Sequence, residues 1–98
     1  MELVYFFGMD SEKSMLKLLD EDFWKRLGPT VREAKAMGLD KSGFCIYIKA
    51  RDDLAIEAKR QLAESPATLL EGEDADLVLK AFKDEAEAAE AGMGALFG

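Results

Sequence analysis

The stretch that decides the fold is Leu3-Val4-Tyr5-Phe6-Phe7, which Gly8 ends. A continuous apolar run of this length, made of residues that favour strands, predicts a strand covered on both faces. A second run of the same kind, Phe44-Cys45-Ile46-Tyr47-Ile48, predicts a second buried strand. Residues 67–70 predict a short third strand, since Ser65-Pro66 stops the preceding segment and Gly72 turns the chain.

In the rest of the chain, apolar residues recur at helical spacing. We expect helices over residues 11–19, 20–27, 29–37 and 51–62, and a long helix that starts at Asp74 or Asp76. In residues 29–37, the apolar positions Val31, Ala34 and Met37 recur at helical spacing. Pro29 suits a first helical turn and Gly38 suits a stop, so this segment is predicted to be a helix.

The order of these elements is strand, helices, strand, helix, strand, helix. Alternation of this kind favours an α/β fold with a small, three-stranded, mostly parallel sheet packed with helices. The alternative is an α+β fold with an antiparallel edge strand. We expect an α/β domain over residues 1–83, and an acidic helical tail rich in Ala and Glu, with an apolar terminus, over residues 84–98.

Composition limits the classes of function. The chain has 98 residues, of which 49% are hydrophobic, and this predicts one domain with a real core. No apolar run is long enough to span a membrane, and no basic segment precedes the first apolar run, so we expect a cytoplasmic protein. Cys45 is the only cysteine and histidine is absent. We therefore interpret Cys45 as a packed core thiol and expect neither catalysis nor a cofactor.

Carboxylates follow each predicted strand: Asp10, then Asp52 and Asp53, then Glu71. In a parallel sheet all four would meet at the C-terminal edge, where α/β proteins place ligands. Clustered carboxylate oxygens suit Mg²⁺, so a metal-binding or small-ligand domain is one alternative function. Acids are equally favoured at helix N-termini as caps and as partners of the helix dipole.

The net charge of −7 is concentrated at one end of the chain. Residues 1–70 hold 12 acids and 11 bases, whereas residues 71–98 hold 8 acids and 2 bases. Such an end repels nucleic acid, so we expect no nucleic-acid partner. A basic protein surface is its natural complement, and charge of this kind chiefly accelerates the encounter of two partners.

The acidic end also carries an apolar pattern. Met93, Leu96 and Phe97 are spaced i, i+3, i+4, so a helix places all three on one face, as groove-binding helices do. Glu87 and Glu90 lie just upstream and are placed to meet a basic rim. This predicts a protein-interaction module whose partner has an apolar groove. The alternatives are that the tail folds back on its own domain, or that it packs between the subunits of a homo-oligomer.

Residues 85–98, Glu-Ala-Glu-Ala-Ala-Glu-Ala-Gly-Met-Gly-Ala-Leu-Phe-Gly, resemble the C-terminal tail of the archaeal acidic ribosomal stalk protein. That family's tail lays its apolar residues, as a short helix, into a groove of translational GTPases. The resemblance implies that Met93, Leu96 and Phe97 are the anchors, that Gly98 is the characteristic terminus, and that the setting is archaeal and cytosolic. The family begins with a helical dimerisation domain, which residues 1–70 do not resemble.

Overall fold

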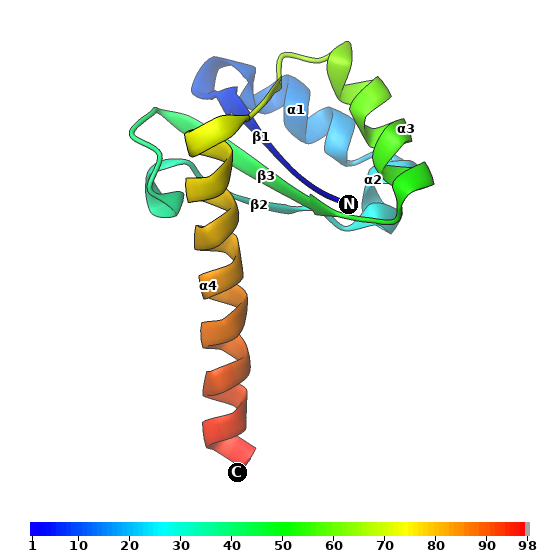
Figure 1. Cartoon of the computed structure of the whole chain (residues 1–98). Coiled ribbons are helices and arrows are strands. Elements are labelled where there is room, and N and C mark those ends of the chain that lie inside the picture. The colour runs from blue at the N-terminus through cyan, green and yellow to red at the C-terminus, as the bar shows by residue number, and fades with distance from the viewer. Residues whose placement is uncertain (98) are drawn as a thin grey trace.

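A four-stranded antiparallel sheet forms the centre of the computed structural model, which describes the backbone of residues 1–97 and the side chains of residues 1–89 (Figure 1). The elements in chain order are β1 (Glu2–Gly8), the 3-10 turn η1 (Met9–Ser11), α1 (Glu12–Leu19), α2 (Asp22–Leu27), β2 (Thr30–Glu33), the 3-10 turn η2 (Lys35–Met37), β3 (Gly43–Lys49), α3 (Asp52–Ala63), β4 (Thr68–Leu69) and α4 (Gly72–Phe97). The three strands expected from the apolar runs are confirmed as β1, β3 and β4.

The strands lie in the order β2-β3-β1-β4, and each neighbouring pair is antiparallel. Tyr5 of β1 stands between Ile46 of β3 and Leu69 of β4. Each helical crossover therefore connects two parallel strands that have a third strand between them. This is the connectivity of the ferredoxin-like βαββαβ fold, here followed by one additional helix, α4.

The expectation of a three-stranded, mostly parallel sheet was wrong: within residues 1–97 the sheet has four strands, and each neighbouring pair of strands is antiparallel. It rested on the continuous apolar character of β1 and β3, which is typical of strands in parallel sheets. Such an apolar run indicates only that both faces of the strand are covered. Here α1, α2 and α3 cover one face and α4 covers the other, and strand direction plays no part in that.

The helix expected over residues 29–37 was also wrong. Thr30–Glu33 is an edge strand, β2, and Lys35–Met37 is a single 3-10 turn. Val31 pairs with Ile46 of β3, while Ala34 and Met37 are buried under α4. A four-residue strand next to a tight turn places apolar residues at intervals that imitate a helix, and the pairing with β3 decides between the two.

The face of the sheet toward α1, α2 and α3 holds the larger core cluster. Leu3, Tyr5 and Phe7 of β1 point into it, as do Ile46 and Ile48 of β3. The Trp24 side chain of α2 is fully buried there, and its indole N–H donates to the Gln61 amide oxygen of α3 at 2.7 Å. This hydrogen bond gives the buried indole the partner that it needs.

The opposite face of the sheet holds a second cluster, which α4 covers. It contains Val4 of β1, Cys45 of β3, and Val78 and Phe82 of α4. α4 follows β4, at one edge of the sheet, and Glu85 reaches β2 at the other edge, so the helix crosses all four strands.

The long C-terminal helix is confirmed, and it starts at Gly72 rather than at Asp74 or Asp76. Its 26 residues correspond to about 39 Å of helix. The boundary expected between residues 83 and 84 falls inside α4. In the part of the chain that the structure describes, no helix combines the length and the apolar character needed to cross a membrane.

Candidate functional site

The first half of α4 is fixed to the sheet by apolar contacts. Val78 is fully buried and Phe82 is only 5% exposed. The Phe82 ring stacks on the Tyr47 ring of β3, with centroids 5.2 Å apart and an angle of 20° between the planes. Loss of a buried aromatic side chain of this size costs about 3–5 kcal/mol, so these residues set the position of α4 on the sheet.

Ion pairs add to this attachment near the point where α4 leaves the sheet. The Arg32 guanidinium of β2 donates from Nε and Nη2 to Oε1 of Glu85, both at 2.8 Å, and from Nη1 to the Val31 carbonyl at 2.8 Å. Lys83 Nζ lies 3.5 Å from the Glu2 carboxylate of β1. All of these groups are partly solvent-exposed, so each pair contributes at most about 1 kcal/mol.

Glu2 also accepts a hydrogen bond from the Tyr47 hydroxyl, beneath α4. Burial, together with this hydrogen bond, raises the pKa of Tyr47 to about 12. The same hydrogen bond, helped by Lys83, lowers the pKa of Glu2. Tyr47 therefore stays protonated at neutral pH and Glu2 stays ionised, which is suited to a fixed structural contact and not to proton transfer.

Beyond Glu85 the helix has left the sheet. The side chains of Ala86, Glu87, Ala88 and Ala89 are all exposed, while the helical backbone continues to Phe97. Figure 1 shows this half of α4 extending away from the sheet. The other residues expected to bind a partner, Glu90, Met93, Leu96, Phe97 and Gly98, lie outside the residues whose side chains are described.

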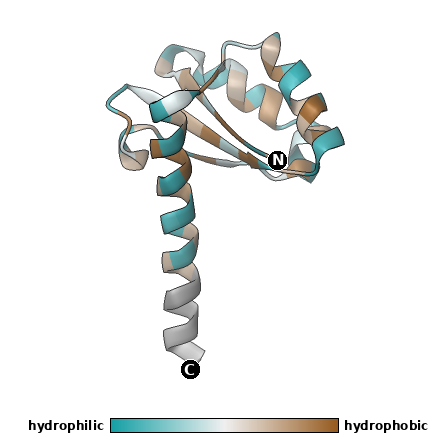
Figure 2. Cartoon of the chain, viewed as in Figure 1, coloured by the Kyte–Doolittle hydropathy of each residue, from teal (hydrophilic) through white to brown (hydrophobic). Residues whose placement is uncertain are grey.

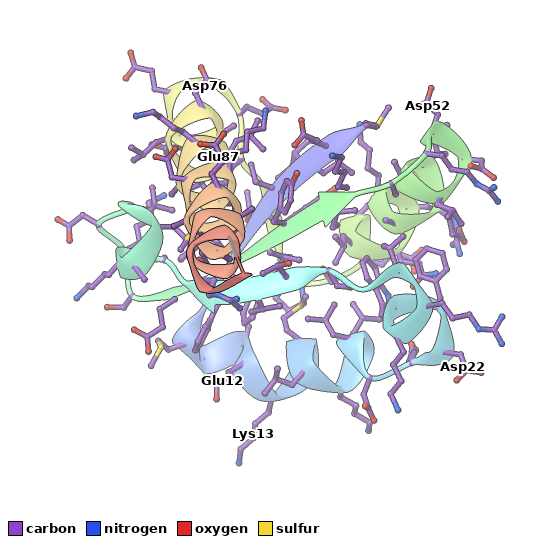
Figure 3. The ribbon with its side chains drawn as sticks, turned by 90° about the horizontal axis from the view of Figure 1, so that it is seen from below. Glu12, Lys13, Asp22, Asp52, Asp76 and Glu87 are labelled. Atoms are coloured by element: carbon purple, nitrogen blue, oxygen red, sulfur yellow. The ribbon has the colours of Figure 1, made fainter. Side chains whose placement is uncertain are left out.

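The candidate metal ligands do not converge. Because β1 and β3 are antiparallel, Asp10 after β1 and Asp52 after β3 lie at opposite ends of the sheet, so the expected common edge does not exist. Figure 3 shows Asp52 far from Glu12, which follows Asp10 closely in the chain. Asp52 lies 3.9 Å from the N-terminal amine, and Asp53 pairs with Arg51 at 2.8 Å.

Glu71 follows β4 and is exposed. No three His, Cys, Asp or Glu side chains within residues 1–89 are grouped so that they could hold a metal ion. These carboxylates instead match their alternative interpretation, because Asp52 and Asp53 occupy the first turn of α3.

Cys45 is fully buried between the sheet and α4, and burial raises the pKa of its thiol to about 11. A nucleophilic cysteine needs the opposite shift. The interpretation of Cys45 as a core thiol is confirmed.

A groove that the sequence did not predict lies between α1 and β2, on the face of the sheet opposite to α4. Phe7, Leu16, Val31 and Phe44 line it around a cavity of about 190 Å³, with Glu12 at its margin. Leu16 is 52% exposed there. The expected helix over residues 29–37 would hold Val31 away from the sheet, so nothing in the sequence placed β2 beside α1.

A second, more polar cavity has a volume of about 150 Å³. It is lined by Met9, Glu33, Lys35, Lys41, Ser42 and Gly43. The ammonium group of Lys41 lies 5.5 Å from the centroid of the Phe6 ring. Phe6 packs with the cluster beneath α4, so the Lys41 ammonium lies on the face of the sheet opposite to the groove.

Comparisons of the chain with protein-family models, with curated proteins and with solved structures find no match. The βαββαβ connectivity supports many unrelated activities, so function has to be argued from the surfaces of this molecule.

Proposed function

We propose that this protein is a non-enzymatic interaction module whose docking element is the second half of α4. The observation that carries the proposal is the division of this helix. Residues up to Glu85 are attached to the sheet, and residues 86–97 continue the same helix beyond it. The helix extends beyond the sheet that it covers. Its attached half therefore holds the second half in a fixed direction, where another molecule can contact it.

The pattern of residues along α4 supports a docking role. Val78 and Phe82 mark the face of the helix that packs on the sheet. At 100° per residue, Ala89, Met93 and Leu96 continue this same face past the sheet. Hydrophilic and hydrophobic positions alternate around the described part of α4 (Figure 2).

The charges along this half of the helix suggest the chemistry of the partner. Asp84, Glu87 and Glu90 fall on the sides and back of the helix, away from the line of Ala89 and Leu96. An amphipathic helix of this kind fits an apolar groove with a basic rim. The resemblance of residues 85–98 to the archaeal stalk tail supports a translational GTPase as the partner.

The test is binding of the full chain to an archaeal translational elongation factor by surface plasmon resonance. Phe97→Ser removes an anchor that the groove would bury, and we expect it to abolish measurable binding. Glu87→Lys with Glu90→Lys should mainly slow association and weaken its dependence on salt. The matched control is Ile56→Ser on α3, where the side chain is 62% exposed and distant in the chain from α4.

Two outcomes would contradict this proposal. If Phe97→Ser binds as tightly as the wild type, the apolar residues of the tail are not the anchors. If Ile56→Ser weakens binding as much as Phe97→Ser, the surface of the domain and not α4 makes the contact.

A further inference from the structure

β2 lies at one edge of the sheet, and half of its backbone hydrogen-bonding groups face away from β3. The Ala34 N–H donates to the Gly43 carbonyl of β3 at 2.9 Å. Hydrogen-bonded pairs alternate along an antiparallel ladder, so Arg32 also bonds to β3, whereas Val31 and Glu33 direct their N–H and C=O groups outward. Among the residues that the structure describes, only the Val31 carbonyl of this outward set has a partner, the Arg32 guanidinium at 2.8 Å.

An apolar groove follows the same edge, on the face of the sheet toward α1. We name it the α1–β2 groove, and it is lined by Phe7, Leu16, Val31 and Phe44. A further cavity of about 320 Å³ shares Leu16 and Val31 with it and continues to Pro29, at the start of β2. Leu16 is 52% exposed between the two. The apolar groove and the outward backbone groups of β2 therefore lie side by side.

An extended chain matches both features of this edge, whereas a helix matches only the groove. A strand laid beside β2 exchanges hydrogen bonds with Val31 and Glu33 and places every second side chain over the groove. A helix bonds its own N–H and C=O groups internally, so it would leave those of β2 without a partner. The backbone of β2 therefore selects a strand as the occupant.

A second copy of β2 fits this edge poorly. Outward residues pair only with outward residues, which leaves three antiparallel registers for two β2 strands. Val31 opposite Val31 places Glu33 opposite Pro29, which has no N–H to donate. Glu33 opposite Glu33 brings two carboxylates together, and Val31 opposite Glu33 brings the two Arg32 side chains together. Like charges directly opposite each other destabilise a pair of strands, so the added strand has another sequence.

The charges on the groove side of β2 indicate the composition of that strand. Glu33 shares a face of the sheet with Val31, because residues two apart in a strand point the same way. Glu33 is exposed and Glu12 lies at the groove margin, and within residues 1–89 neither carboxylate forms an ion pair. Lys35 lines a cavity with Glu33 but belongs to η2, after the strand has ended. A basic residue opposite Glu33 and an apolar residue opposite Val31 complement this edge.

We propose that β2 binds an extended segment of another protein, which adds to the sheet as a fifth strand, antiparallel to β2. On binding, the Arg32 guanidinium releases the Val31 carbonyl and stays paired with Glu85. Figure 3 shows β2 between α4 on one side and α1 on the other, so the added strand lies between these two helices. The inference does not rest on the proposed function, because the docking element is β2 and not the second half of α4.

The test is an NMR titration of the isotope-labelled full chain with the blocked peptide acetyl-Thr-Lys-Thr-Val-Thr-amide. In the antiparallel arrangement the peptide lysine lies opposite Glu33 and the peptide valine opposite Val31. In the free protein, the Val31 and Glu33 amides should exchange with solvent faster than the Arg32 and Ala34 amides. Bound peptide should shift the Val31 and Glu33 signals most. At about ten times the dissociation constant it should slow the exchange of these two amides about tenfold.

Methylated peptides separate strand addition from simple apolar contact. A methyl group on the valine nitrogen removes a donor that faces β2 and should abolish binding. The same group on the middle threonine nitrogen points away from β2 and is the matched control. In the protein, Leu16→Glu places a carboxylate in the groove and should weaken binding about tenfold. Ile56→Glu, at an exposed apolar site on α3, is its control, and circular dichroism confirms that both variants are folded.

The inference is overturned if millimolar peptide causes no shifts, if the shifts fall outside β2 and α1, or if the two methylated peptides bind alike. It is also overturned if the Val31 and Glu33 amides of the free protein exchange as slowly as those of Arg32 and Ala34. Shifts of Val31 and Glu33 that depend on protein concentration alone would assign the edge to a second copy instead. None of these results involves Phe97, so the proposed function is tested separately.

Discussion

Phe82→Ala is the substitution that tests the attachment of α4 most directly. The ring is 5% exposed, belongs to the second core cluster and stacks on Tyr47. An aromatic side chain buries about 150–250 Å² on folding, which at about 25 cal/mol per Å² corresponds to about 4–6 kcal/mol. Compaction of the unfolded chain reduces this figure, and we expect a loss of about 3–5 kcal/mol in the free energy of unfolding.

The assay is urea unfolding, followed by circular dichroism and by the fluorescence of Trp24. Trp24 lies in the cluster on the opposite face of the sheet. If α4 unfolds together with the domain, the two signals change at the same urea concentration in wild type and variant. The control is Leu77→Ala on the same helix, where the side chain is 45% exposed and the expected loss is about 1 kcal/mol or less.

Equal losses from Phe82→Ala and Leu77→Ala would refute the reasoning. In that case Phe82 is not buried between α4 and the sheet, and the helix has no fixed direction. The two signals separating in the wild type would lead to the same conclusion, because α4 would then detach while the Trp24 cluster stays folded.

Three further predictions concern the sheet beneath α4. Gly43→Ala should destabilise the fold by about 1–3 kcal/mol in the same unfolding assay, because the new Cβ would overlap the Phe7 carbonyl oxygen; an unchanged unfolding midpoint would contradict this close approach. Burial raises the pKa of the Cys45 thiol to about 11, so this thiol should react with a thiol reagent at pH 8 only as fast as the protein unfolds. Rapid reaction in native buffer would show that the thiol is exposed. Tyr47 has its pKa raised above the ordinary 10.0 to about 12, so its contribution to stability is complete below pH 10 and is lost as the pH rises toward 12. Tyr47→Phe should reduce this alkaline loss, measured as the free energy of unfolding against pH, and an unchanged profile would assign the loss to other groups.

The candidate site was only partly predictable. The spacing of Met93, Leu96 and Phe97 and the acidity around Glu87 are visible in the sequence, and so is the long helix that carries them. The α1–β2 groove was invisible, because it is formed by residues that are far apart in the chain, Leu16 and Phe44 among them, and meet only through the order of the strands. The expected carboxylate cluster failed for the same reason, since reversing the direction of β3 moves Asp52 away from Asp10.

The sequence by itself determined most of the helices and the three strands other than β2. Apolar runs located β1 and β3, apolar spacing located α1 and α3, and Ala and Glu favoured a long α4, because such preferences depend on neighbours within a few residues. Tertiary structure alone decided strand direction, the assignment of Thr30–Glu33 to a strand, and which faces were covered. Those depend on pairing between distant segments: Val31 becomes part of a strand because Ile46 lies beside it, and β1 is buried on both faces because α4 crosses the sheet.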